Sequence, residues 1–202
     1  MRHSRAEKAA THQRIVQIAA RRFRERGIDG IGVADIMREA GLTVGGFYKH
    51  FDSREALVME ALTVAFAGLE AWETAARGSL RRAILAYLSP GHRDDRTDSC
   101  PLAALLNDVP RGVRPGVASD AANVYTEQLI RVFDFFERLL PADGRDDRDD
   151  RGARARLVFS ACVGALTLAR AVDDPGLSRE ILDTVADRLI DAFAPAEVPA
   201  SA

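Results

Sequence analysis

The chain has 202 residues, 47% of them hydrophobic, and a formal net charge of −2, so it is long enough for one or two domains with a sizeable core. Its two cysteines, Cys100 and Cys162, lie far apart, which argues against a disulfide framework or a cysteine-rich zinc site. The first residues are charged and no apolar run reaches membrane-spanning length, so we expect a cytoplasmic protein that has no membrane partner.

The net charge hides an uneven distribution along the chain. Residues 1–26 carry eight Lys or Arg and two acids, for +6, whereas the rest of the chain sums to −8. A basic end on an acidic body is typical of a surface that faces DNA phosphates, although arginine rows on helices are often simply solvated. The segment 1–10 is expected to be either an arm that reaches DNA or a loose tail.

The next segment predicts a helix-turn-helix unit. A first helix, 11–26, which Gly27 ends, is followed by a second, 33–40, which Gly41 ends by adopting the left-handed conformation. A third helix spans 44–50. Helix, glycine-containing turn and helix is the supersecondary unit that reads DNA in many regulators, although a helical hairpin in a bundle has the same pattern.

The third helix has two different faces. Phe47 and Phe51 lie one turn apart and are expected to be buried, and the Thr43 hydroxyl is expected to cap the helix. Gly45 and Gly46 each weaken a helix by about 1 kcal/mol relative to alanine, but they let the backbone approach a DNA strand closely. The polar groups of the exposed face suit phosphate oxygens. The predicted DNA-binding residues are Thr43, Val44, Gly45, Gly46, Tyr48, Lys49, His50 and Arg54.

Downstream of Ser53, which with Asp52 is a candidate helix cap, the apolar periodicity predicts only helices. The first is long, from residue 54 to about 76. The next, 80–88, is expected to point Ile84, Leu85 and Leu88 inward, to end at Ser89-Pro90-Gly91 and to be followed by a charged loop over 92–99. Further helices are expected over 102–108, 117–140, 153–172 and 177–193, with irregular or charged connections at 110–116 and 141–152.

The last two of these helices are long and apolar. Residues 157–169 contain no charge, and Gly164 is one of several small residues that let helices approach closely. Such a stretch must be covered, either inside the monomer or by a second copy.

The run AGLTVGGFYKHFDSREAL resembles the signature of TetR-type transcription regulators. It supplies the Ala-Gly pair, the small hydroxyl residue, the following glycine, the aromatic-Tyr-x-x-Phe block and the basic-Glu pair, and the resemblance extends over about residues 11 to 62. Two positions depart from the pattern. Gly32 stands where the family usually has Thr or Ser before the second helix, and Val44 stands where it often has Lys or Arg.

This resemblance implies an all-α fold with an N-terminal three-helix helix-turn-helix head and a C-terminal helical body. It divides the chain into a DNA-binding domain (1–58), an effector-binding and dimerisation domain (59–194) and a loose tail (195–202). It also implies a homodimer formed by the last two helices, a palindromic double-stranded DNA operator, and a small-molecule effector that releases a repressor from it. The candidate effector-binding residues are Trp72, Tyr87, Cys100, Tyr125 and Phe159.

Two other functions stay open. Cys100 lies at a predicted helix start, where the helix dipole favours a thiolate, so it is either a thiol or electrophile sensor or a small buried residue. A helical small-molecule-binding protein without DNA binding is the second alternative. The sequence has no Gly-x-Ser-x-Gly elbow, P-loop or dinucleotide fingerprint, so we expect no enzyme, catalytic residue, cofactor or metal site.

Overall fold

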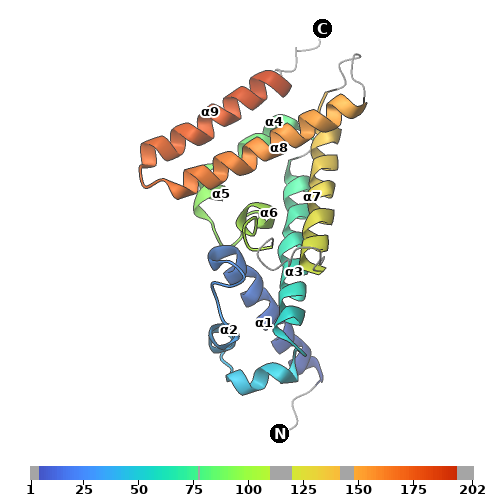
Figure 1. The fold of residues 1–202 in the computed structure, drawn as a ribbon, viewed down its shortest axis with the longest axis vertical. Coiled ribbons are helices and arrows are strands. Elements are labelled where there is room, and N and C mark those ends of the chain that lie inside the picture. Colours follow the sequence, from blue (N-terminus) through green and yellow to red (C-terminus); the bar gives the residue numbers. More distant parts are fainter. Residues whose placement is uncertain (1–4, 77, 110–119, 142–147, 195–202) are drawn as a thin grey trace. The chain divides into compact units, whose positions relative to one another are not determined.

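The structure is a computed structural model that describes residues 5–76, 78–109, 120–141 and 148–194. Within these ranges the regular structure is helical, as Figure 1 shows, and the predicted all-α class is confirmed. The helices are α1 (Arg5–Arg26), α2 (Val33–Glu39), the 3₁₀ helix η1 (Val44–Lys49), α3 (Arg54–Ala75), α4 (Leu80–Tyr87), α5 (Pro90–Asp94), α6 (Pro101–Ala104), α7 (Asp120–Leu139), α8 (Arg148–Ala171) and α9 (Pro175–Phe193).

The chain divides into two compact units. The first comprises Met1–Glu70 and Arg96–Gln128, and the second comprises Ala71–Asp95 and Leu129–Ala202. Helices α3 and α7 each contribute residues to both units. The predicted boundary at residue 58 lies inside α3 and stays a prediction.

The first unit contains the helix-turn-helix. Its core includes Ile15 and Phe23 of α1, which are 0% and 1% exposed. Gly27 and Gly41 follow α1 and α2 with φ values of +82° and +72°, so both predicted helix stops are confirmed. Arg22 of α1 donates a hydrogen bond to the Glu39 carboxylate at the end of α2 (2.7 Å) and fixes the two helices against each other.

Three local predictions in this unit need correction. Residues 5–10 belong to α1 rather than to an arm, because this alanine-rich stretch continues the helix. The reading helix is a 3₁₀ helix, which suits a segment whose two adjacent glycines make a regular α-helix costly. Thr43 makes no side-chain cap; its carbonyl oxygen accepts from the Gly46 N–H instead (2.9 Å). Of the two candidate caps of α3, Ser53 is the one that accepts, from the Ala56 N–H (3.1 Å).

Described residues between Arg96 and Val109 contact the helix-turn-helix within the first unit. The Arg24 guanidinium of α1 donates to Asp98 (2.9 Å) and to the Ala65 carbonyl oxygen of α3 (3.5 Å). Gly27 lies so close to Asp108 that a Cβ atom there would come within 2.7 Å of the carboxylate. The end of α1 therefore carries contacts to residues far along the chain.

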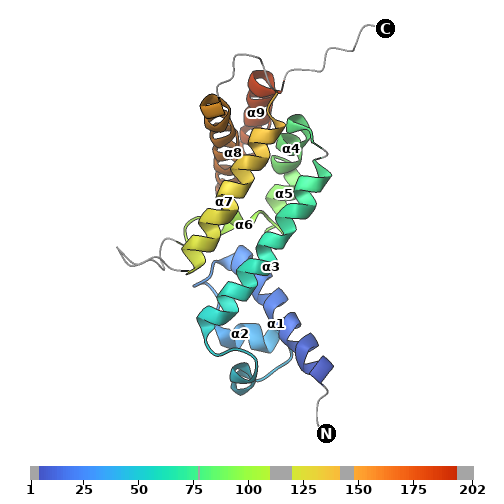
Figure 2. The same ribbon diagram turned by 90° about the vertical axis from the view of Figure 1, so that its right-hand side faces the viewer.

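The second unit is built on the α8–α9 hairpin, with α4 packed on α9 (Figure 2). Asp174 caps α9 by accepting from the backbone N–H groups of Gly176 (2.7 Å) and Leu177 (3.1 Å). Arg170 of α8 donates to the main-chain oxygens of His92 (2.6 Å) and Arg93 (3.0 Å). Since main-chain oxygens at a helix end lack helical partners, this arginine stabilises the end of α5.

Some predictions for the second unit are wrong. The expected charged loop begins with α5, because Ser89 caps this helix (His92 N–H to Ser89 Oγ, 3.1 Å) and Pro90 occupies its first position. Leu85 is 45% exposed rather than inward. Helix α8 begins at Arg148, inside the expected loop.

In the first unit, α6 ends at Ala104, four residues before the predicted end of its helix, and turns follow. Parts of the predicted N-terminal arm (1–4), of the two irregular connections (110–119 and 142–147) and the predicted tail (195–202) lie outside the described residues.

One helical stretch, Asp150–Ala171, is long and apolar enough to cross a membrane by length and composition. Its Val158, Cys162 and Leu166 are 0% exposed within the fold. A core helix of a soluble bundle has the same composition, so this stretch is weak evidence for a membrane span.

Candidate functional site

A hollow of about 690 Å³ lies between the first two turns of α1 and the 3₁₀ helix η1 with the residues that flank it. It brings together most of the predicted DNA-binding residues. Helix α1 adds Lys8, which the sequence placed in an arm that could reach DNA, and Thr11, which was not predicted to belong to the site. The two residues are three positions apart and so lie on one face of α1, which is the signal that could have placed Thr11 there. An adjoining depression shares Lys8, Lys49 and His50 with the hollow and adds Arg5. The hollow is lined by Glu7, Lys8, Thr11, Leu42, Thr43, Gly46, Tyr48, Lys49 and His50.

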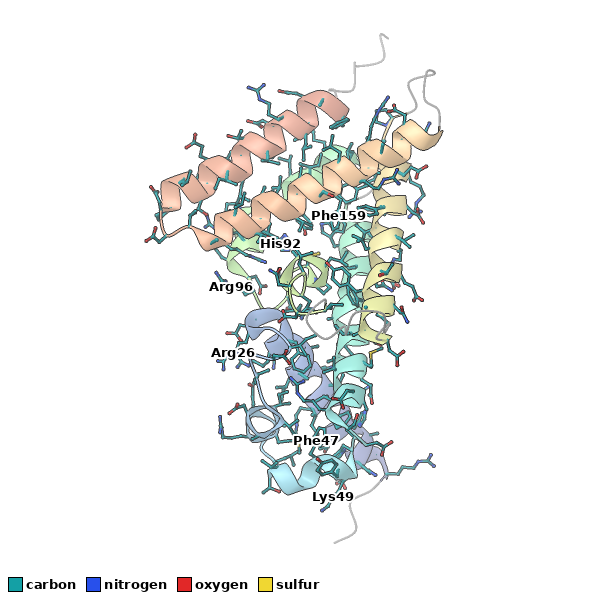
Figure 3. The ribbon with its side chains drawn as sticks, in the orientation of Figure 1. Arg26, Phe47, Lys49, His92, Arg96 and Phe159 are labelled. Carbon is teal, nitrogen blue, oxygen red and sulfur yellow. The ribbon has the colours of Figure 1, made fainter. Side chains whose placement is uncertain are left out.

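Two stacked phenylalanines orient η1. The Phe47 and Phe51 rings lie 5.3 Å apart between centroids, and the residues are only 2% and 3% exposed, so the predicted burial is confirmed. Figure 3 shows Phe47 pointing into the helical head and Lys49 pointing out of it. Tyr48 is 77% exposed. The buried pair therefore holds the hydroxyl and ammonium groups on the solvent side.

A histidine pair lies at the edge of the hollow, and one member, His50, lines it. His12 of α1 shares a hydrogen bond with Glu60 of α3 (Nε2 to Oε2, 2.6 Å), and its ring stacks on Phe51 at 4.5 Å. The His50 ring lies 6.1 Å from that of His12. Burial lowers the pKa of His50, and the charges of His12, Lys8 and Lys49 lower it further. His50 is thus kept neutral near pH 7.

The surroundings of the two ring nitrogens of His50 determine which of them carries the proton that it can donate. Nδ1 is buried and has no hydrogen-bond partner among the described residues. A proton there would be a buried donor without an acceptor, which is unfavourable, so the neutral ring is assigned its proton on Nε2. In this tautomer His50 offers one N–H donor.

The first turn of η1 leaves its backbone open to solvent. A Cβ atom added at Gly45 would meet no atom within 4 Å, whereas one at Gly46 would lie 3.6 Å from Met37 Cε. Val44 is 51% exposed. Gly45 therefore faces away from the protein and Gly46 faces toward it.

Arg54, the last predicted DNA-binding residue, lies elsewhere. Its guanidinium donates to the Ile28 carbonyl oxygen and lies 3.5 Å from the Asp29 carboxylate. These contacts brace the loop after α1, and Arg54 does not line the hollow. Its contact with DNA stays a prediction.

The candidate effector residues fall into two groups. Trp72, Tyr87 and Phe159 form an aromatic cluster in the second unit, in which the Tyr87 ring lies 5.9 Å from Trp72 and 5.7 Å from Phe159. Figure 3 shows Phe159 on α8 and His92 on α5. The sequence reasoning missed His92, whose ring contacts Tyr87 at 4.7 Å. The indole Nε1 of Trp72 is buried without a partner among the described residues, so it is a donor that a ligand can satisfy.

Cys100 and Tyr125 belong to the first unit. Cys100 is 7% exposed. The Tyr125 hydroxyl donates to the Leu102 carbonyl oxygen (2.6 Å), and burial, with a smaller effect of the Cys100 charge, raises the pKa of Tyr125 to about 12. This arrangement keeps Tyr125 protonated and Cys100 covered. In the part of the chain that the structure describes, no group of three or more His, Cys, Asp or Glu side chains is placed to hold a metal ion.

Comparison with known proteins identifies relatives of the head. The profile described as bacterial regulatory proteins of the tetR family matches residues 15–61. The transcriptional repressor KstR2 of Rhodococcus jostii is 42% identical over 55 residues, which are 27% of this chain and 27% of that protein. KstR2 of Mycolicibacterium smegmatis is 37% identical over 57 residues, 28% of each chain. The matched segment thus spans little more than a quarter of these relatives.

Solved structures match nearly the whole chain. A TetR transcriptional regulator from Chloroflexus aurantiacus aligns with a TM-score of 0.74 and 19% identity over 95% of this chain and 100% of its own. The reduced form of Escherichia coli NemR aligns with a TM-score of 0.71 and 18% identity over 93% of this chain and 100% of its own. At this identity the likeness establishes the fold. Residues 15–61 therefore match the tetR family of bacterial regulatory proteins, and the chain as a whole has the fold of solved TetR-family regulators.

Proposed function

We propose that this protein is a DNA-binding transcription regulator, a repressor that a small molecule releases from a palindromic operator. The hollow between α1 and η1 carries the proposal. It gathers the ammonium groups of Lys8 and Lys49 with the Tyr48 hydroxyl and the His50 imidazole on one surface. Such donors bind phosphate oxygens and fix the register of a protein on a duplex.

The second unit supports assembly into a homodimer. Leu157 and Leu168 of α8 are 57% and 59% exposed, and Gly164 lies between them on the same helix face, with open space where its side chain would be. Exposed apolar side chains around a small residue favour close packing of a second helix. Through α8 and α9, two copies would present their reading helices to successive major grooves, about 34–36 Å apart.

The aromatic cluster of the second unit supports a small-molecule effector. Aromatic walls with few polar groups suit an apolar or planar ligand. The unpartnered Trp72 indole N–H, buried among the described residues, adds a preference for a ligand that carries a hydrogen-bond acceptor. Such a ligand releases DNA to the extent that it binds the non-operator form more tightly than the operator form.

This role is regulatory rather than enzymatic, and it places the protein in the cytoplasm, with its DNA. The thiol-sensor alternative is less well supported, because Cys100 is buried. A ligand-binding protein without DNA binding is disfavoured by the basic hollow of the head.

The test is selection of bound fragments from genomic DNA by the purified protein, followed by sequencing. Lys8→Ala and Lys49→Ala are each expected to lower the slope of log affinity against log salt by about one unit per half-site. Tyr48→Phe is expected to weaken binding to operator and unrelated DNA alike. Arg81→Ala, at an exposed position of α4, serves as the control and is expected to bind as the wild type does. Unchanged affinity of all three head variants at two salt concentrations would overturn the assignment of this surface.

A further inference from the structure

The first turn of η1 presents an unusual set of groups to a DNA groove. Val44 is a branched apolar residue that is 51% exposed, and the two residues that follow, Gly45 and Gly46, have no side chain. The polar side chains of η1, Tyr48 and Lys49, lie at its other end. The leading turn of the reading helix therefore offers an isopropyl group and bare backbone.

Val44 contributes little to the packing or capping of η1. The core-forming residue of η1 is Phe47, which is 2% exposed. Thr43, the residue before Val44, makes no side-chain capping hydrogen bond, so the Val44 side chain supports no cap. An apolar side chain that neither fills the core nor supports a cap is free to serve an outside partner.

The chemistry of the major groove limits what that partner is. Each base pair displays donors and acceptors there, and the 5-methyl group of thymine is the apolar group among them. An isopropyl group cannot exchange hydrogen bonds with base edges, so its matched contact is this methyl group. The bare backbone at Gly45, where a Cβ atom would meet no other atom within 4 Å, allows the turn to come close enough for such a contact.

We propose that Val44 is a specificity-determining residue that contacts the 5-methyl group of a thymine in each operator half-site. The inference rests on the proposed function, since it requires that η1 enter the major groove. It assigns sequence reading to Val44 and leaves positioning on the phosphates to Lys8, Tyr48 and Lys49.

The experiment uses the full-length protein and a duplex selected from randomised DNA. Each thymine of the duplex is replaced in turn by deoxyuridine, which removes the methyl group and keeps the base pair. At one thymine per half-site, the wild type is expected to lose about fourfold in affinity, the effect of one buried methyl group. Val44→Ala is expected to bind the thymine and deoxyuridine duplexes equally at that position.

A matched variant separates this contact from a general effect of truncation. Val64→Ala removes the same atoms from an exposed valine of α3, which is 40% exposed, and is expected to keep the full sensitivity to deoxyuridine. If deoxyuridine weakens the wild type and Val44→Ala equally at every position, or weakens neither, Val44 does not read a methyl group and the inference fails alone. If the wild type selects no DNA at all, the proposed function fails with it.

Discussion

Replacing Gly45 with alanine should move stability and DNA affinity in opposite directions. Gly45 has a negative φ and open space around its Cβ position, so alanine fits the backbone without a clash. Removing a glycine from such a site stabilises a protein by about 0.4–1 kcal/mol, chiefly by restricting the unfolded chain. For a chain of this size this corresponds to a rise in melting temperature of about 1–4 °C.

The same methyl group is expected to weaken DNA binding. Among the described residues, nothing occupies the space in front of Gly45, so under the proposed function a DNA strand can approach the backbone there. A methyl group there holds the head away from the duplex, and losing one hydrogen bond to a charged phosphate costs about 1.5–3 kcal/mol. We therefore expect Gly45→Ala to lose about tenfold or more in operator affinity.

Two further glycine-to-alanine variants test whether the loss of affinity is specific to Gly45. Gly68→Ala adds a methyl group in open space on α3, outside the hollow, and is expected to leave operator binding unchanged. Gly46→Ala adds one that faces Met37 at 3.6 Å, so, although Gly46 lines the hollow, it is expected to weaken operator binding less than Gly45→Ala does. Calorimetric melting and fluorescence anisotropy on a labelled operator measure the two quantities. A Gly45→Ala protein that melts higher and binds DNA as tightly as the wild type would refute the close-approach argument.

Three further predictions concern the second unit and the thiols. Burial lowers the pKa of His92, so the unfolded chain binds this proton before the folded chain does as the pH falls through about 6.5. Urea unfolding is therefore expected to show that the free energy of unfolding decreases as the pH is lowered through this value, and that it decreases less in His92→Gln. An equal decrease in both proteins would exclude His92 as a cause. Gly164→Arg is expected to give monomers in ultracentrifugation that no longer bind a palindromic site, and a wild type already monomeric at micromolar concentration would contradict the proposed interface. Cys100 and Cys162 are 7% and 0% exposed, so native protein is expected to resist iodoacetamide until it unfolds; rapid modification of Cys100 would instead favour thiol sensing.

Local signals in the sequence were sufficient for most of the head. Gly27 and Gly41 end their helices with positive φ values as expected, and Phe47 and Phe51 are buried. These features depend on residues within one or two turns of each other, so they can be predicted from spacing. The helix type of η1 could not, because two adjacent glycines restrict the backbone too little to choose between α and 3₁₀ geometry.

The errors in the body arose where one signal has two meanings. Ser89 and Pro90 follow an apolar helix and so predict its end, but a serine followed by a proline is also a cap with the first helical residue, and here the two residues begin α5. The apolar Leu85 was placed inward by type, although an exposed leucine is common on protein surfaces. The contribution of Lys8 to the candidate site depended on how α1 meets η1, which is a tertiary contact.

The ion pair between Arg24 and Asp98 shows the same limit at longer range. The two residues are 74 positions apart, and nothing near either of them indicates its partner. The assignment of Arg96–Gln128 to the same unit as the helix-turn-helix therefore became visible only in the folded chain.

That grouping has a consequence for anyone who wishes to transplant the head onto another regulator. A chimera joined at residue 58 would carry Gly27 and Arg24 without the Asp108 and Asp98 that pack and pair with them. The foreign body would have to offer a carboxylate at both places, or leave the end of α1 with a gap and a cation that has lost its carboxylate. A graft that takes Arg96–Gln128 together with the first seventy residues keeps both contacts native. The exchangeable part of this protein is therefore discontinuous in sequence, and its operator preference should transfer intact only when both pieces move together.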